Sequence, residues 1–133
     1  MQYVDASALA KVHLDEPDTD AADAILGSDP SWATARHTFV QVRRTLARLL
    51  SGEELRAARE SFHRDWYRVR VIDLDEGVCE RAAELAEATG VRTLDALHLG
   101  AADVFGPGSM PFVTFNRRLA EAARALGWEV RGA

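Results

Sequence analysis

The chain has 133 residues, of which 47% are hydrophobic and 28% charged, as in an ordinary globular protein, and we expect one domain over residues 1–133. Its net charge of −5 argues against a protein that coats nucleic acid by bulk attraction, but not against a nucleic-acid enzyme with an acidic metal site. A single cysteine excludes an intramolecular disulfide and no apolar run could span a membrane, so we expect a cytoplasmic protein.

The first half of the chain predicts helices that follow short strands. A buried strand is expected to end at Val4 and to place Asp5 at the start of a helix. Ligands of open α/β sheets sit beyond the carboxyl ends of the strands, so Asp5 lies where an acid can work. The alternative is that Asp5 or Ser7 only caps the helix. Up to residue 67 we expect helices over 6–14, 19–26 (ended by Gly27), 36–50 and 51–67, and a strand over 30–34.

The second half of the chain continues the alternation. The β-branched run 69–74 predicts a strand, and Asp75 is expected to cap the next helix. The remaining elements are expected to be helices over 75–89, 93–104 and 116–126, a loop over 106–108, and strands over 112–115 and 128–130. Strands that alternate with helices imply crossover connections. The predicted fold class is therefore α/β, a three-layer α/β/α domain with a mainly parallel central sheet.

Three polar residues stand at the ends of predicted elements. Asp5 follows a strand, Asp95 lies in the first turn of a helix, and Asn116 separates a strand from a helix. Helix capping and the helix dipole explain each of them separately. If their oxygen atoms converge at one crevice, they would form a site for a hard divalent cation such as Mg²⁺ or Mn²⁺. Spacing alone leaves both interpretations open.

Three segments resemble a known family. Residues 3–9 (YVDASAL), 93–99 (TLDALHL) and 113–119 (VTFNRRL) look like the motifs of a PIN domain, and more closely like those of VapC-type toxins from bacterial toxin–antitoxin pairs. The resemblance covers the whole chain, with the motifs in the same order and at matching spacing. It implies a PIN-like fold and a metal-dependent endoribonuclease that uses Mg²⁺ or Mn²⁺.

The resemblance also implies a set of site residues. Asp5 and Asp95 match the family's first and third acids, and we expect them to bind the metal. Gln41 falls at the second position, a Glu within the third helix in the family, and Asn116 at the fourth, usually an Asp. These four form the expected catalytic set. Each amide keeps a carbonyl oxygen but removes one negative charge, so we expect weaker metal binding and one ion rather than two.

Further residues are candidates for supporting roles. Ser7 and Thr114 are candidate partners of the metal ligands. Four arginines beside the amide positions could bind RNA phosphates, although a solvated helix face is the simpler explanation for each of them: Arg43, Arg44, Arg117 and Arg118. His98 is interpreted as a packed or hydrogen-bonded residue rather than a general base.

Two functional hypotheses remain. In the first, the chain is an active ribonuclease with a diluted metal site, which forms a homodimer and is silenced by a small VapB-like antitoxin, both implied by the resemblance. In the second, it is a catalytically degenerate PIN module that binds RNA or a protein partner without cleavage. Gln41 favours the second hypothesis, and the retained pair of aspartates favours the first.

Overall fold

The computed structural model describes residues 1–106 and 108–133, so Pro107 of the expected loop 106–108 lies outside the described residues. In the described part the strands are β1 (Gln2–Val4), β2 (Trp32–Ala35), β3 (Arg70–Ile72), β4 (Phe112–Thr114) and β5 (Val130–Gly132). The helices there are α1 (Ala6–Lys11), α2 (Thr19–Ser28), α3 (Thr38–Leu49), α4 (Gly52–Trp66), α5 (Glu76–Thr89), α6 (Thr93–Phe105) and α7 (Arg117–Ala125).

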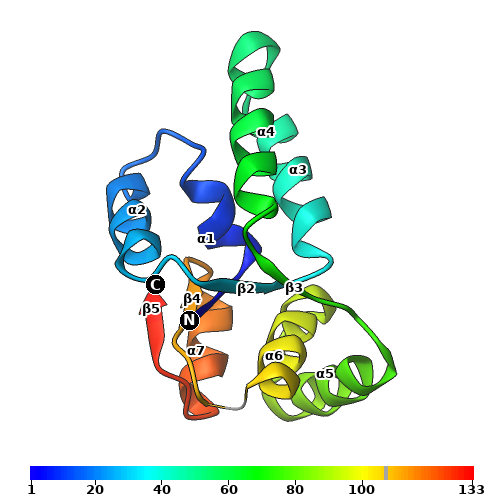
Figure 1. Ribbon diagram of the computed structural model, residues 1–133. Helices are drawn as coiled ribbons and strands as arrows, with labels where there is room; N and C mark the ends of the chain where they lie inside the picture. Colours follow the sequence, from blue (N-terminus) through cyan, green and yellow to red (C-terminus); the bar gives the residue numbers. More distant parts are fainter. Residues whose placement is uncertain (107) are drawn as a thin grey trace.

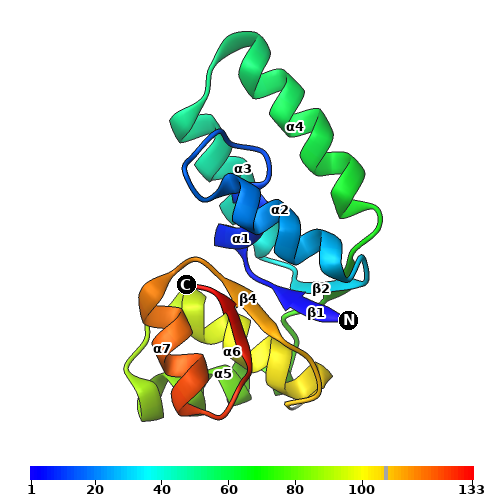
Figure 2. The ribbon, with the colours of Figure 1, turned by 90° about the vertical axis from the view of Figure 1, so that its left-hand side faces the viewer.

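The described strands form a single five-stranded parallel sheet in the order β3-β2-β1-β4-β5. Helices α1 to α4 lie on one side of it and α5 to α7 on the other, and the α3–α4 hairpin extends well beyond the sheet (Figures 1 and 2). The predicted three-layer α/β/α class is therefore confirmed. Within residues 1–106 and 108–133, no helix is both long and apolar enough to cross a membrane.

The central strands alternate between two cores, one on each side of the sheet. Tyr3 and Phe112 pack into the core under α5, α6 and α7, and their rings stack with centroids 5.0 Å apart. The next residues along, Val4 and Val113, face the core under α1 to α4. This period of two is the geometry of a strand that is buried on both faces.

Strand β1 lies at the point where the sheet order reverses. The chain leaves β1 toward β2 and β3 on one side and later returns to β4 on the other. Val4 pairs with Val113, and the Asp5 amide donates to the Val113 carbonyl at 3.0 Å. The residues after β1 and β4 therefore meet at a topological switch point, where open α/β sheets bind ligands.

Several predicted helix ends differ from the structure, and those of α1 and α2 have a clear local cause. Helix α1 ends at Lys11 rather than at 14, because the His13 amide bonds back only three residues, to the Ala10 carbonyl (3.0 Å). Gly27 does not end α2: its φ is not positive, so the helix continues to Ser28 and stops where Asp29 turns extended (φ −147°).

The last strand begins two residues later than predicted. Trp128 is buried in the core beside Phe112, with ring centroids 5.9 Å apart, and its amide donates to the Ala123 carbonyl (2.9 Å) instead of to β4. Pairing with β4 starts when the Phe112 amide donates to the Glu129 carbonyl (2.8 Å), and Val130 is the first paired residue.

Strand β5 ends in close contact with β4. Gly132 has a φ of +108°, and a Cβ at this position would lie 2.3 Å from the Thr114 carbonyl oxygen. The amide of Ala133 donates to the same oxygen at 2.8 Å. Only glycine fits this close approach, which supports the backbone of Thr114 from behind.

Candidate active site

The carboxylate of Asp5 is buried and held by three donors. Its Oδ1 accepts from the Ala8 amide (2.9 Å) and from the Ser7 hydroxyl (2.7 Å), and its Oδ2 accepts from the Thr114 hydroxyl (2.6 Å). The hydrogen bond from the Ala8 amide is an N-cap, so Asp5 does cap α1, as the capping interpretation predicted. The two hydroxyls go beyond capping, because Thr114 arrives from β4. Ser7 and Thr114, the predicted partners, thus both contact this acid.

Asp95 and Asn116 lie together at the same edge of the sheet. Asp95 is the third residue of α6 and is half-buried. Asn116 caps α7 through its Oδ1, which accepts from the Leu119 amide, and its Nδ2 lies 3.5 Å from the Asp95 Oδ2. The backbone amide of Asn116 donates to the Thr114 hydroxyl (3.0 Å). Three of the predicted residues therefore converge from β1, α6 and α7.

Each of the two acids lies in the electrostatic field of other charged groups, and among the described residues neither is in an ion pair. Burial, with a smaller contribution from the charge of Asp95, raises the pKa of Asp5 to about 6 against the lowering effect of its three hydrogen bonds. Burial also raises the pKa of Asp95, opposed mainly by the charge of Arg92. Among the described residues no Lys, Arg or His nitrogen lies within 4 Å of either carboxylate.

This donor set suits a hard divalent cation. Two carboxylates that burial makes reluctant to ionise, without a basic partner, are stabilised by a bound positive ion. The described part of the chain holds no cluster of three or more His, Cys, Asp and Glu side chains placed to hold a metal. Mg²⁺ commonly takes one or two carboxylates and fills its other positions with water and phosphate. Asp5 and Asp95 therefore fit one such ion, and Asn116 adds a neutral group beside them.

Gln41 is oriented by a buried histidine. It is the fourth residue of α3, in its first turns rather than at its middle, and its Oε1 lies 2.7 Å from Nε2 of His98. An amide oxygen only accepts, so Nε2 of His98 carries the proton, and the Nδ1 lone pair accepts from the Tyr3 hydroxyl (2.8 Å). Burial lowers the pKa of His98 well below its ordinary value, which keeps the ring neutral. The Gln41 oxygen thus accepts from His98 with one of its two lone pairs, and its amide nitrogen is a donor.

His37 extends this polar group toward Asp95. Its ring lies 4.2 Å from the His98 ring, and its Nε2 is 3.0 Å from the Leu94 carbonyl. Burial lowers the pKa of His37, while the Asp95 charge acts in the opposite direction. The sequence signal for this cluster was the i, i+3 spacing of Asp95 and His98, which places both on one side of α6.

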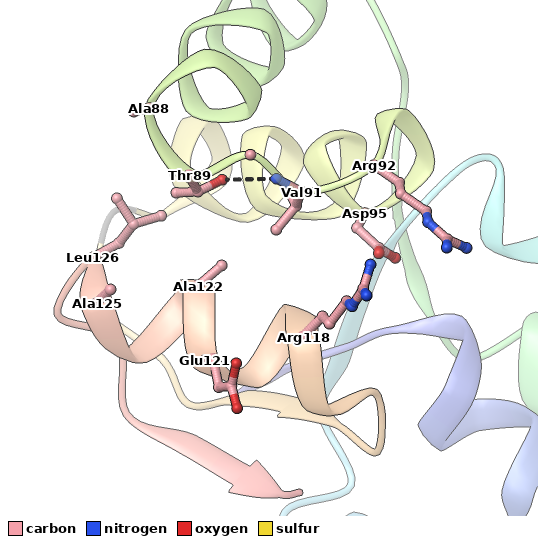
Figure 3. A pocket seen from close by; sticks show the side chains of 11 residues that line it. Ala88, Thr89, Val91, Arg92, Asp95, Arg118, Glu121, Ala122, Ala125 and Leu126 are labelled. Carbon is pink, nitrogen blue, oxygen red and sulfur yellow. Dashed lines mark hydrogen bonds between the residues drawn. The ribbon is translucent and has the colours of Figure 1, made fainter.

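The four candidate arginines are placed differently. Arg43 packs over the Phe39 ring (5.6 Å) with its guanidinium 3.2 Å from His63, so its head group is engaged with α4. Arg44 and Arg117 are exposed, as on a solvated helix face. Arg118 extends from α7 toward Asp95 and lines a hollow there (Figure 3).

Two charged residues at this hollow were missed from the sequence, Arg92 and Glu121. Arg92 precedes the first turn of α6, three residues before Asp95, and Figure 3 shows it beside that carboxylate. Glu121 lies one turn after Arg118 on α7. Their i, i+3 spacings were the available signal, because such spacing places side chains on the same helix face.

The comparisons with known proteins all indicate the same family. The PIN domain family model matches residues 2–125. Ribonuclease VapC46 of Mycobacterium tuberculosis is 33% identical over 132 residues, 96% of this chain and 94% of that protein. Among solved structures, M. tuberculosis VapC20, described as a Sarcin-Ricin loop cleaving toxin, matches with a TM-score of 0.77 at 21% identity, over 98% of this chain and 99% of that one.

A second solved structure shares the fold and comes from a toxin–antitoxin complex. VapBC2 of Rickettsia felis, bound to a DNA fragment from its promoter, matches with a TM-score of 0.68 at 15% identity, over 99% of this chain and 98% of that one. The family model spans nearly the whole chain, and ribonuclease VapC46 matches over almost its full length. The chain therefore belongs to the PIN domain family and, within it, to the VapC ribonucleases.

Proposed function

We propose that the protein is a toxin endoribonuclease that cleaves RNA with a divalent cation, Mg²⁺ or Mn²⁺, held by Asp5 and Asp95. The observation that carries the proposal is the buried carboxylate of Asp5, fixed by three donors beside a second acid and without an ion pair to any basic residue in the described part of the chain. The VapC relatives, which are named ribonucleases, support RNA as the substrate class.

The chain's own groups have distinct parts in this reaction. A bound divalent cation supplies a Lewis acid that stabilises charge on the phosphate and activates water. Ser7, Thr114 and the Ala8 amide hold Asp5 in one orientation, so that its remaining lone pairs point into the site. The Asn116 side chain lies against Asp95 and steadies that acid. The free amide nitrogen of Gln41 is a donor for a phosphate oxygen, which a carboxylate at this position could not be.

The charge of the site sets the number of ions. Two carboxylates give about −2, and two amides add none. Two cations roughly 3.5–4 Å apart need bridging negative charge to offset their repulsion. We therefore expect one ion per site, and weaker binding than a four-carboxylate site would give.

A second candidate function is a PIN module that binds RNA or a protein without cutting. The observation that favours it is the hydrogen bond from His98 to Gln41, which engages one lone pair of that side-chain oxygen with a buried histidine instead of a cation. If the wild-type protein is inert and the Gln41→Glu variant cuts RNA, this second function is correct.

The proposal includes two protein partners, a VapB-like antitoxin and a second copy of this chain. The VapBC2 complex supports the antitoxin. Large apolar side chains on and beside the α3–α4 hairpin remain exposed, notably Val40 (66%) and Tyr67 (91%), and so offer surface for such contacts. Light scattering of the free protein tests the homodimer, which predicts twice the 14.6 kDa mass of one chain.

The test of the cleavage proposal is a structured RNA incubated with the protein and Mn²⁺ or Mg²⁺. We expect cuts that disappear with EDTA and in Asp95→Ala. Asp20→Ala is the matched control, since Asp20 is likewise the first-turn acid of a helix, α2, but is exposed and distant in the sequence. Cleavage that survives Asp95→Ala, or that is equally lost in Asp20→Ala, would contradict the assignment.

A further inference from the structure

A hollow of about 600 Å³ opens beside the candidate active site. It lies between the end of α5, the start of α6 and helix α7, and Asp95 is part of its lining (Figure 3). Its volume is in the range of small-molecule sites. The cation-binding role proposed above uses only Asp95 of this lining and leaves the rest of the hollow without a function.

The inner walls of the hollow are small and apolar. Ala122 and Ala125 lie on one face of α7, and Figure 3 shows Ala122 pointing across the gap toward Val91. On the far side, α5 ends at Gly90 in the left-handed conformation (φ +75°), where a Cβ would meet nothing within 4 Å. Short side chains on both walls leave a slot instead of a packed helix contact.

The mouth of the slot carries cations next to the acid. Arg118 extends from α7 toward Asp95, and Arg92 lies beside the same carboxylate (Figure 3). Within the described residues neither guanidinium is in an ion pair at 4 Å or less. A guanidinium group can donate two hydrogen bonds to one phosphate, and it can also stack on a nucleobase. Glu121 stands at the rim, on the side of α7 turned away from Val91.

An apolar slot that adjoins two free guanidinium groups and a catalytic carboxylate matches one chemical class, a nucleotide. A free phosphate would leave the slot empty, and a purely apolar ligand would leave the arginines without a partner. Proteins read single-stranded RNA by holding unstacked bases against flat or apolar walls while cations hold the backbone.

We propose that this hollow receives the unstacked base of the nucleotide next to the phosphodiester that is cut, with Arg92 and Arg118 on its phosphate. The inference rests on the proposed ribonuclease function, since it takes the substrate to be RNA. The hollow is thus a base-binding subsite, and its occupation aligns the neighbouring phosphate with Asp5 and Asp95.

Binding is tested with mononucleotides, without requiring cleavage. Adenosine 5′-monophosphate should shift the methyl NMR signals of Val91, Ala122 and Leu126, whereas ribose 5-phosphate, which lacks the base, should leave them in place. Base stacking in such sites is worth about 1–3 kcal/mol, so the nucleotide should bind about 5- to 150-fold more tightly than the sugar phosphate.

Two variants fill the slot from opposite walls, Ala125→Trp from α7 and Ala88→Trp from α5. Both positions are exposed, so either variant can fold if the other does not. Each should abolish the nucleotide-induced shifts. Ala83→Trp is the matched control on an exposed position of α5 that does not line the hollow, and it should bind as wild type does.

Cleavage gives the second readout. In an RNA that the protein cuts, an abasic nucleotide next to the cut should lower kcat/KM about tenfold or more in wild type, and should have no further effect in Ala125→Trp. Nucleotide shifts without any RNA cleavage would overturn the ribonuclease but keep the subsite. Cleavage that ignores the abasic position, with no base-dependent shifts, would overturn the subsite alone. Loss of a protein partner in both Trp variants, without any nucleotide response, would make the hollow a protein-docking surface.

Discussion

Helices α1 and α5 begin with the same local structure and have different surroundings. Asp5 and Asp75 have nearly equal backbone angles (φ −80° and ψ 176°, against φ −77° and ψ −178°). Each carboxylate accepts from the amide three residues on, Ala8 or Val78, at 2.9 Å. Asp5 is 2% exposed and receives two more hydrogen bonds, whereas Asp75 is exposed. The N-cap hydrogen bond is therefore the same in the two helices.

The difference comes from the position of each helix in the sheet. Asp5 follows β1, the central strand, and β4 brings Thr114 to it from more than one hundred residues away. Asp75 comes after β3, at the edge of the sheet, where no strand lies on the outer side. A cap therefore becomes a candidate catalytic residue only when the topology buries it and adds a second acid. The predictions below test this comparison.

The largest effect is expected from removing the two caps in parallel. Asp5→Ala should lower the rate of metal-dependent RNA cleavage by about a thousandfold, since it removes a ligand of the cation. Asp75→Ala should keep wild-type cleavage and lose only about 1 kcal/mol of stability, the usual value of an N-cap. Cleavage assays and urea unfolding of both variants measure the contrast. Equal losses of activity in the two variants would mean that Asp5 serves only as a helix cap.

The next effect concerns stability and pH. Because the pKa of Asp5 is about 6 in the folded protein and 3.8 ordinarily, the folded state binds its proton more tightly. The protonated form of Asp5 therefore stabilises the fold relative to the ionised form. This stabilisation is fully present below about pH 4 and is lost as the pH rises through about 6. In EDTA, Asp5→Asn should unfold at higher urea than wild type at pH 7, by up to about 3 kcal/mol, and lose this advantage at pH 4.

A divalent cation is the control for this pH effect. Mn²⁺ should stabilise the wild type at pH 7 and leave Asp5→Asn nearly unchanged, since a ligand stabilises only the state that binds it. A stability difference that does not vary between pH 4 and pH 7 would contradict the raised pKa of Asp5.

A smaller effect is expected at the hydroxyl that reaches Asp5 from β4. Thr114→Val removes a hydrogen bond that lowers the pKa of Asp5, so cleavage should fall about 10- to 100-fold, most strongly on the acid side of the pH profile. Thr34→Val is the control, because Thr34 is equally buried and its hydroxyl bonds to the Val4 carbonyl instead. Should both variants lose activity with unchanged pH profiles, the role of Thr114 would be structural only.

The smallest effect is expected at Gln41. In Gln41→Glu one carboxylate oxygen can keep the bond from His98 while the other adds negative charge toward the cation, so Mn²⁺-dependent cleavage should rise about tenfold. Gln41→Ala, which removes both groups, should lower it. Titration calorimetry with Mn²⁺ measures the same change as tighter binding.

The sequence was sufficient for the features that depend on short-range pattern. The alternation of Tyr3 and Val4, followed at once by Asp5, predicted a buried strand with an acid at its end. The three motifs then placed Thr114 within a second strand and Asn116 directly after it. Because parallel strands share one carboxyl edge, the meeting of these residues followed from the fold class.

The features that the sequence did not reveal depend on distant side chains. The orientation of Gln41 is set by His98, 57 residues away, and by the Tyr3 hydroxyl behind it. The hollow beside Asp95 results from small side chains on helices that are not adjacent in the chain. The start of β5 depends on where Trp128 packs. None of these contacts has a local periodicity from which it could be inferred.

The glycine at the end of β5 ties the last residues of the fold to its first acid. Any side chain at position 132 would push against the carbonyl of Thr114, whose hydroxyl holds Asp5. If Asp5 is the acid of the proposed cleavage, damage to that chemistry can begin at a residue with no direct contact to it. Mutational screens that score position 132 as a structural terminus would then be recording the alignment of Asp5.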